Sequence, residues 1–268
     1  MIKMAKKILI LIAALLLVLV LSFLGIQSYR ARVLNNVAVH KSDTPTIVLH
    51  GSGGNYLSLG PMTIRLAQHD LAQRAMTIRV DKAGNLDVHQ YRDLKNNPLI
   101  LVLLKDNKNP IGGQKALSDI MKRLYKDYGV RRVNFIGHSM GGGIMFRYLE
   151  QPQAKTPKVM KFVSLSVPYL GFGKYMGANS PYFQDMVKNK DKLPKDLRIL
   201  NMVGNVNGRN SDTQVTVHSA LGLKTLTDGQ IKHYQAKVIP GNFWTASHFM
   251  IHENPNVDKI IAEFLWGQ

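Results

Sequence analysis

The feature that most restricts the fold is a serine between two glycines, placed where an apolar strand runs into a helix. Residues 132–141 read RVNFIGHSMG, and a helical pattern follows to about residue 148. Gly137 and Gly141 are needed because side chains there would collide with the neighbouring strand and helix. Such a turn strains the serine backbone and lifts its hydroxyl above the sheet edge, in front of the positive end of the helix dipole. We therefore predict that Ser139 is a catalytic nucleophile; the alternative is a glycine-rich turn that only permits close packing.

A glycine-rich loop after an earlier strand supplies a second element. Residues 47–55 read IVLHGSGGN, and the glycines let backbone N–H groups approach a substrate oxygen without obstruction from Cβ. We predict that the N–H groups of Ser52 and Met140 form an oxyanion hole. The loop lacks both Gly-x-x-x-x-Gly-Lys-Ser/Thr and Gly-x-Gly-x-x-Gly, so a nucleotide site is disfavoured. Ser52 is a weaker candidate nucleophile than Ser139 because it lacks the strand-turn-helix setting.

A serine hydroxyl is a poor nucleophile near neutral pH and needs a histidine base that is oriented by a carboxylate. Asp212 is the predicted acid because it lies in a polar loop after the strand predicted at residues 198–203. His248 is the predicted base because it lies between the strand predicted at residues 235–239 and the last helix. The order serine, acid, histidine is a known arrangement of such triads. The alternatives are a merely solvated Asp212, other aspartates and a second histidine: Asp185, Asp191, Asp196 and His252.

The remaining histidines and the absence of cysteine limit other chemistry. His248 and His252 have the i, i+4 spacing of a metal pair, but no glutamate stands between them as in His-Glu-x-x-His and no third ligand is evident. We therefore predict neither a metal nor a cofactor. His50 and His138 flank the two loops and are interpreted as structural. The chain has no cysteine, which excludes disulfides and a thiolate nucleophile.

Beyond about residue 40, short apolar runs alternate with amphipathic or turn-rich stretches. This alternation predicts an α/β fold with a mostly parallel central sheet and helices on both faces. The predicted strands are residues 46–50, 76–80, 99–105, 133–137, 161–167, 198–203 and 235–239, and the predicted helices include 113–128 and 256–266. Residues 169–196 break the alternation with Gly, Pro, Lys and aromatic residues, which predicts a lid-like insertion. We interpret residues 42–268 as one domain, because no second core is evident.

The amino terminus predicts a membrane anchor. Three lysines precede an uncharged apolar run, residues 8–26, whose roughly 19 residues span about 28 Å as a helix, close to the ~30 Å hydrocarbon core. The run is longer than the apolar part of a signal peptide, so a cleaved signal is the lesser alternative and a buried core helix the least favoured. The early lysines place the short end in the cytoplasm. We predict a single-pass anchor over residues 1–27, a linker over 28–41 and an extracellular domain.

The charge balance adds a prediction about partners. The 268 residues carry a formal net charge of +18, which favours anionic surroundings such as membrane lipid or wall polymer. Scattered surface charge that only maintains solubility is an equal alternative. Nucleic-acid binding is not predicted, because the domain is expected outside the cell and no binding motif is evident. Much of the excess lies near one helix end, at Lys122, Arg123, Lys126, Arg131 and Arg132.

The GHSMG turn, the HGSGG loop, the Ser-Asp acid loop and the segment SHFMIHENP before a terminal FLWG together resemble the α/β-hydrolase superfamily. Within it they resemble a family of uncharacterised cell-surface hydrolases of Gram-positive bacteria that carry an amino-terminal membrane segment. The resemblance covers roughly residues 42–267 and implies, by position, nucleophile Ser139, acid Asp212 and base His248. It also implies a glycine after the acid, where this chain has Thr213.

The predicted function is a membrane-anchored, extracellular serine hydrolase. It is expected to act as a carboxylesterase or lipase-like enzyme on small-molecule or lipid-like acyl esters, through an acyl-enzyme intermediate. An acyltransferase with the same triad is the nearer alternative, and a surface binding module without turnover is the more distant one. The resemblance does not identify a natural substrate, because this fold carries many activities.

Overall fold

One mixed sheet organises the chain. In the computed structural model, which describes residues 2–151, 153–172 and 177–267, the strand order is β3-β2-β4-β1-β5-β6-β7-β8. All neighbouring pairs are parallel except β2 and β3. Because β1, β5, β7 and β8 run in the same direction, the loops that follow them meet at one edge. The strands are β1 (Thr46–Leu49), β2 (Gln73–Val80), β3 (Leu86–Gln90), β4 (Pro98–Leu104), β5 (Arg132–His138), β6 (Lys158–Leu165), β7 (Arg198–Val206) and β8 (His233–Gly241).

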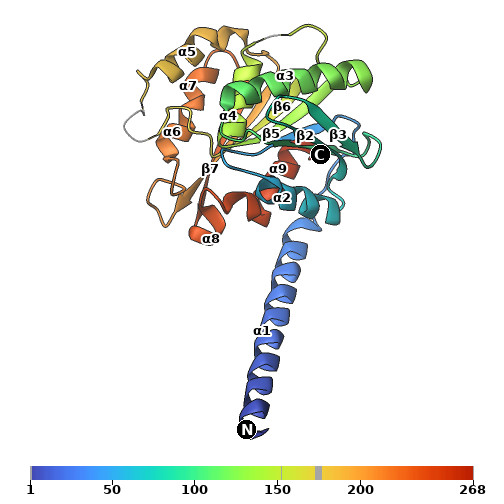
Figure 1. Ribbon diagram of the computed structural model, residues 1–268. Helices are drawn as coiled ribbons and strands as arrows, with labels where there is room; N and C mark the ends of the chain where they lie inside the picture. The colour runs from blue at the N-terminus through green and yellow to red at the C-terminus, as the bar shows by residue number, and fades with distance from the viewer. Residues whose placement is uncertain (1, 152, 173–176, 268) are drawn as a thin grey trace.

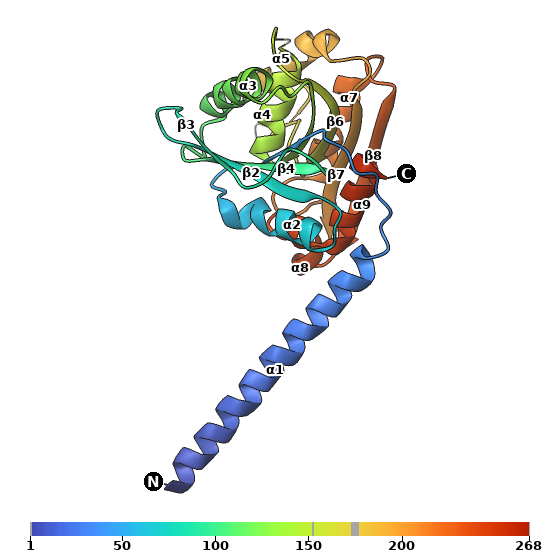
Figure 2. The ribbon, with the colours of Figure 1, turned by 90° about the vertical axis from the view of Figure 1, so that its right-hand side faces the viewer.

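Helices cover both faces of the sheet (Figure 1; Figure 2). Helices α3 and α4 lie together on one face, and α2 and α9 lie on the other. A cluster of buried apolar side chains fills the space between the sheet and the helices on each side. The predicted α/β fold is therefore confirmed. The helices are α1 (Ile2–Leu34), α2 (Tyr56–Gln68), α3 (Pro110–Asp127), α4 (Met140–Leu149), α5 (Pro181–Asn189), α6 (Val217–Leu221), α7 (Leu223–Thr227), α8 (Phe243–Ala246) and α9 (Pro255–Trp266), with short 3-10 turns η2 (Lys190–Lys192) and η3 (Ile251–Glu253).

The predicted strands and helices are present with shifted ends. The helix predicted from residue 113 begins at Pro110, because Asn109 caps it and proline is favoured in a first turn. Helix α4 begins directly after Ser139, at Met140. The apolar pattern does not indicate β3, because this antiparallel edge strand is mostly exposed and lacks an apolar run. It also does not indicate α2, which contains Pro61.

Helix α1 projects from the body as one continuous helix (Figure 1). By length and composition, residues Lys6–Leu34 form a helix apolar enough to cross a membrane, and its most apolar window is not buried by the rest of the chain. The last turn packs against α9, where Leu34 is fully buried in the core. The segment predicted as a linker, residues 28–41, therefore differs from the prediction, because its first part continues the helix and joins the body.

The stretch predicted as a lid-like insertion, residues 169–196, contains α5 and η2. Residues 173–176, with Tyr175 among them, lie outside the described residues. Its other aromatic side chains divide into a buried pair, Tyr169 and Phe183, and a roughly half-exposed pair, Phe172 and Tyr182. The described part of this stretch is therefore tied to the core and not wholly a surface excursion.

Candidate active site

Ser139 occupies the turn between β5 and α4 in the strained conformation that the sequence predicts. Its φ is 51° and its ψ is −126°, a region that residues with a side chain rarely adopt. A Cβ at Gly137 would lie 2.4 Å from the Cα of Gly142 in α4, and one at Gly141 would lie 2.4 Å from the carbonyl oxygen of His50. Both flanking glycines are therefore required by the close approach of helix and strand.

Asp212 and His248 form a buried, hydrogen-bonded pair. The Nδ1 of His248 lies 2.8 Å from Oδ2 of Asp212, and the two side chains are 4% and 0% exposed. The other carboxylate oxygen accepts the backbone N–H groups of Gln214 and Val215, at 2.9 and 2.6 Å. The carbonyl oxygen of Asp212 accepts the N–H of His248 at 2.6 Å. Because the carboxylate accepts the Nδ1 proton, Nε2 is left as the basic nitrogen.

Thr213 explains why a glycine is expected after the acid. Its φ is 86°, a left-handed conformation that strains a β-branched residue and suits glycine. Its side chain is exposed, and its backbone N–H bonds to Ser211 Oγ at 3.1 Å. The chain therefore tolerates local strain to keep the Asp212 loop in shape.

Replacing Thr213 with glycine is expected to raise the free energy of unfolding by about 1 kcal/mol, because the relieved strain exceeds the entropy that glycine adds to the unfolded chain. Urea denaturation of the two proteins measures the difference. Thr213→Ala is the matched control and should gain less, since it keeps Cβ. A Thr213→Gly protein less stable than the wild type would contradict the interpretation.

His138, next to Ser139, joins the serine turn to the histidine loop. Its Nε2 lies 3.0 Å from the carbonyl oxygen of His248, and the centroids of the two rings are 4.7 Å apart. Burial, together with the neighbouring His248 and His252, holds the pKa of His138 well below its usual value. The ring is therefore neutral and donates its Nε2–H to that carbonyl. From the sequence His138 is interpreted only as structural, and its position next to Ser139 is the one sign of this connection.

The two atoms that would exchange a proton are free of other partners. Among the described residues, neither Ser139 Oγ nor His248 Nε2 has a hydrogen-bond partner. Ser139 and His248 lie on loops that His138 holds together.

The alternative acids and the alternative histidine make other contacts. The Nδ1 of His252 lies 3.2 Å from Oε1 of Glu253, and the bond to Asp212 is made by His248. The three alternative aspartates bind elsewhere, Asp185 to Arg147, Asp191 to Gln230 and Asp196 to Lys158. Within the described ranges, no group of three potential ligands is arranged to hold a metal ion.

The loop after β1 lies against the serine turn. A Cβ at Gly51 would lie 2.8 Å from Cβ of Ser139, so this loop and the turn are in close contact. His50 fixes the loop, because its Nε2 accepts the N–H of Leu104 at 3.1 Å. Ser52 and Met140 both border the pocket beside Ser139, and neither backbone N–H has an acceptor in the part of the chain described. These two N–H groups are therefore available to an incoming oxygen.

A buried ion-pair network joins α2 and α9 to the segment that follows His248. Arg65 of α2 is 2% exposed and contacts Asp258 of α9 at 2.6 Å and Glu253 at 2.5 Å. Its guanidinium also donates to the carbonyl oxygen of His252. The network thus fixes the segment that follows His248. In the sequence, the only sign of this network is one charged residue on the apolar face of α2, Arg65, and one on that of α9, Asp258.

A largely apolar pocket of about 670 Å³ opens beside Ser139. Residues of α3 and α4 form one wall, with Ile111 and Ile144 among them, and Phe172 and Tyr182 of the predicted insertion form another. Lys108 and Arg147 also border it. The pocket has the volume and the largely apolar lining of a small-molecule site.

Arg147 connects the pocket wall to α5. Its guanidinium contacts Glu150 at 2.8 Å and also binds Asp185 of α5. Glu150 is 1% exposed, and burial raises the pKa of its carboxyl group to about 8 despite the nearby Arg147.

The raised pKa of Glu150 predicts a pH-dependent stability. Between about pH 4.5 and 8, the folded state holds one more proton on Glu150 than the unfolded state does. The contribution of this proton to the free energy of unfolding is therefore complete below pH 4.5 and is lost as pH rises through 8. Glu150→Gln is expected to remove this dependence, which amounts to at most about 1.4 kcal/mol per pH unit. Urea denaturation of both proteins from pH 5 to 9 measures it. A difference that stays constant with pH would contradict the assignment.

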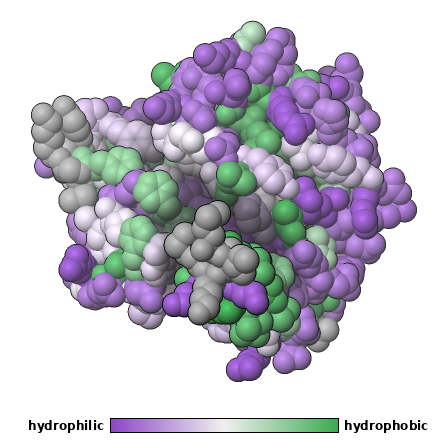
Figure 3. Space-filling view, turned by 60° about the horizontal axis from the view of Figure 1, so that its bottom comes forward, coloured by the Kyte–Doolittle hydropathy of each residue, from purple (hydrophilic) through white to green (hydrophobic). Residues whose placement is uncertain are grey.

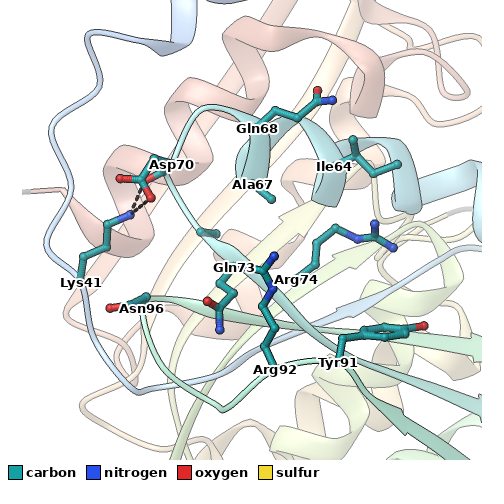
Figure 4. Close-up of a pocket in the computed structure, with 11 residues that line it drawn as sticks. Lys41, Ile64, Ala67, Gln68, Asp70, Gln73, Arg74, Tyr91, Arg92 and Asn96 are labelled. Atoms are coloured by element: carbon teal, nitrogen blue, oxygen red, sulfur yellow. Dashed lines mark hydrogen bonds and ion pairs between the residues drawn. The ribbon is translucent and has the colours of Figure 1, made fainter.

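A second groove, of about 800 Å³, lies at the end of α2 and the start of β2 (Figure 4). Its lining is polar and cationic, with Arg74 and Arg92, while Lys41 pairs there with Asp70 at 2.9 Å. None of Ser139, Asp212 and His248 borders it. The groove is therefore separate from the candidate active site.

The sheet, the strained serine turn and the carboxylate-bound histidine define the α/β-hydrolase class. The family described as "Alpha/beta hydrolase of unknown function (DUF915)" matches residues 35–268, and the chain belongs to this family. No curated protein matches the sequence.

Solved structures agree with this assignment. The lin2722 gene product of Listeria innocua is 25% identical with a TM-score of 0.76, over 83% of this chain and 93% of that one. The "putative cell surface hydrolase" of Lactobacillus plantarum is 20% identical with a TM-score of 0.69, over 83% of this chain and 89% of that one. A lipase-esterase related protein of Clostridium acetobutylicum is 15% identical with a TM-score of 0.51, over 85% and 98%. At these identities, the last two show a shared fold.

Proposed function

We propose that this chain is a serine hydrolase that cleaves carboxylic esters through an acyl-enzyme, tethered to the outer face of the membrane by α1. The observation that carries the proposal is the 2.8 Å bond between His248 and Asp212, made on a loop that His138 joins to the Ser139 turn. The apolar pocket beside Ser139 suits an acyl group. The apolar length of α1 suits a membrane span.

In the proposed reaction each of these groups has one role. Ser139 Oγ attacks the acyl carbonyl and gives its proton to Nε2 of His248, while Asp212 stabilises the charged ring. The N–H groups of Ser52 and Met140 receive the oxyanion. The alcohol leaves with the proton from Nε2, and the same nitrogen then activates a water that releases the acid.

Labelling with a fluorophosphonate probe tests the nucleophile. The full chain in detergent is expected to form a covalent adduct at Ser139, and Ser139→Ala is expected to form none. Ser118→Ala, on α3 and outside the pocket lining, is the matched control and should label normally. Labelling that persists in Ser139→Ala and disappears in Ser52→Ala would identify Ser52 as the nucleophile. No labelling of the wild type would favour a binding module without turnover.

A further inference from the structure

Helix α8 and the loop after it expose three large aromatic side chains beside the candidate active site. Phe243 is 47% exposed, Trp244 is 69% exposed and Phe249 is 57% exposed. We name these three residues the α8 aromatic patch. The rings of Phe243 and Trp244 contact each other, with centroids 5.4 Å apart, and Phe249 follows in the loop beside His248. Exposed apolar side chains that lie together are candidates for a contact surface. Figure 3 looks toward the side from which α1 leaves the body; the densest apolar colouring is α1 itself, and the surrounding surface of the body is mostly hydrophilic with scattered apolar residues.

A chain of hydrogen bonds connects α1 to this patch. The Nδ2 of Asn256, at the start of α9, donates to Tyr29 Oη of α1 at 2.6 Å. The N–H of Asn256 bonds to Oδ1 of Asn254 at 2.9 Å, and Nδ2 of Asn254 donates to the carbonyl oxygen of Thr245 in α8 at 2.9 Å. Thr245 follows Trp244 directly. Two asparagines, Asn256 and Asn254, therefore link Tyr29 to the residue that follows Trp244.

The position of Tyr29 sets the depth of the patch. The apolar run of α1 ends at Ile26, and Tyr29 is three residues further along the helix, a rise of about 4.5 Å. Tyrosine and tryptophan favour this depth, where a membrane meets water. Because α1 stays helical to Leu34 and Leu34 is buried in the core, the helix continues directly into the body. The packing of α1 on the body therefore sets how the body is oriented relative to a bilayer that α1 crosses.

We propose that the α8 aromatic patch inserts into the headgroup layer of the leaflet from which α1 emerges. The proposal rests on the membrane anchoring in the proposed function. It places the histidine loop at the bilayer surface, since the ring of Phe249 lies 5.8 Å from that of His248, centroid to centroid. The substrate class that suits this position is an acyl ester resident in the same leaflet.

Tryptophan fluorescence tests the insertion directly, because the chain has two tryptophans and they differ in exposure. Trp244 is 69% exposed and Trp266 is 4% exposed. The full chain carrying Trp266→Phe is reconstituted in phosphatidylcholine–phosphatidylglycerol vesicles that contain lipids brominated high on the acyl chain. The emission of Trp244 is expected to fall by about half or more. The matched protein with Trp244→Phe reports the buried Trp266 and should be quenched far less.

Three other outcomes are distinct. Trp244 that is quenched by aqueous acrylamide and not by brominated lipid lies in water, and this overturns the insertion. Trp244 that neither quencher reaches is covered by protein, such as a second copy of the chain, and this also overturns it. Failure of the chain to float with the vesicles after alkaline extraction overturns both the anchoring and the insertion.

Substrate preference gives a second readout. The variant with Phe243→Ser and Trp244→Ser should hydrolyse p-nitrophenyl acetate as the wild type does and a vesicle-embedded diacylglycerol about tenfold more slowly. Equal loss on both substrates would contradict a role in membrane contact. Quenching in a protein that hydrolyses neither ester would overturn the hydrolase function while the insertion stands.

Discussion

Ser139→Ala is expected to lower kcat/KM for p-nitrophenyl butyrate by roughly four to six powers of ten. Without the hydroxyl no acyl-enzyme forms, and the residual rate comes from binding and the oxyanion hole alone. The assay uses the full chain in detergent, with initial rates measured over a range of ester concentrations.

The loss at Ser139 is specific only if the fold is intact. The backbone strain that a φ of 51° imposes is similar for alanine and for serine. The melting temperature of Ser139→Ala should therefore match that of the wild type. A variant that melts normally and keeps more than a tenth of the activity would eliminate Ser139 as the nucleophile.

Asp212→Asn is expected to lower kcat by roughly four powers of ten. The amide has the shape of the carboxylate, and its oxygen still accepts the N–H groups of Gln214 and Val215. The NH2 group of the new amide then donates to Nδ1 of His248. This bond requires the tautomer that carries its proton on Nε2, so the nitrogen that should act as the base can no longer accept the serine proton.

The matched control for Asp212 is Asp196→Asn. Asp196 is an exposed aspartate that pairs with Lys158 and does not border the pocket. Its replacement should leave kcat within about twofold of the wild type. If Asp212→Asn and Asp196→Asn lose similar small amounts of activity, another group must orient His248.

Much of the candidate site is predictable because each part has a local signature. Ser139 is marked by the glycines on either side, and the structure shows the collisions that require them. Asp212 and His248 are indicated by their positions after late strands, and the structure brings these two side chains together. Their catalytic roles stay predictions until the kinetics are measured.

Other parts have weak or misleading local signatures. Strand β3 is exposed and short, and α2 contains a proline, so neither produces a clear apolar period. Thr213 departs from the expected glycine, and only its φ of 86° shows that the turn is kept despite the strain. The segment after residue 27 leaves the apolar run and is predicted as a linker. In the structure α1 continues to Leu34, which packs in the core.

The sequence by itself determined the α/β class, the serine turn and an apolar segment long enough for a bilayer, because periodicity, glycine spacing and uninterrupted apolarity are properties of neighbouring residues. Tertiary structure decided which aspartate binds which histidine, how His138 joins two loops, and how Arg65 meets Asp258 across 193 positions. It also decided that α1 is held against α9 beside the aromatic residues of α8. These depend on distances between residues remote in the chain, which only the packed fold establishes.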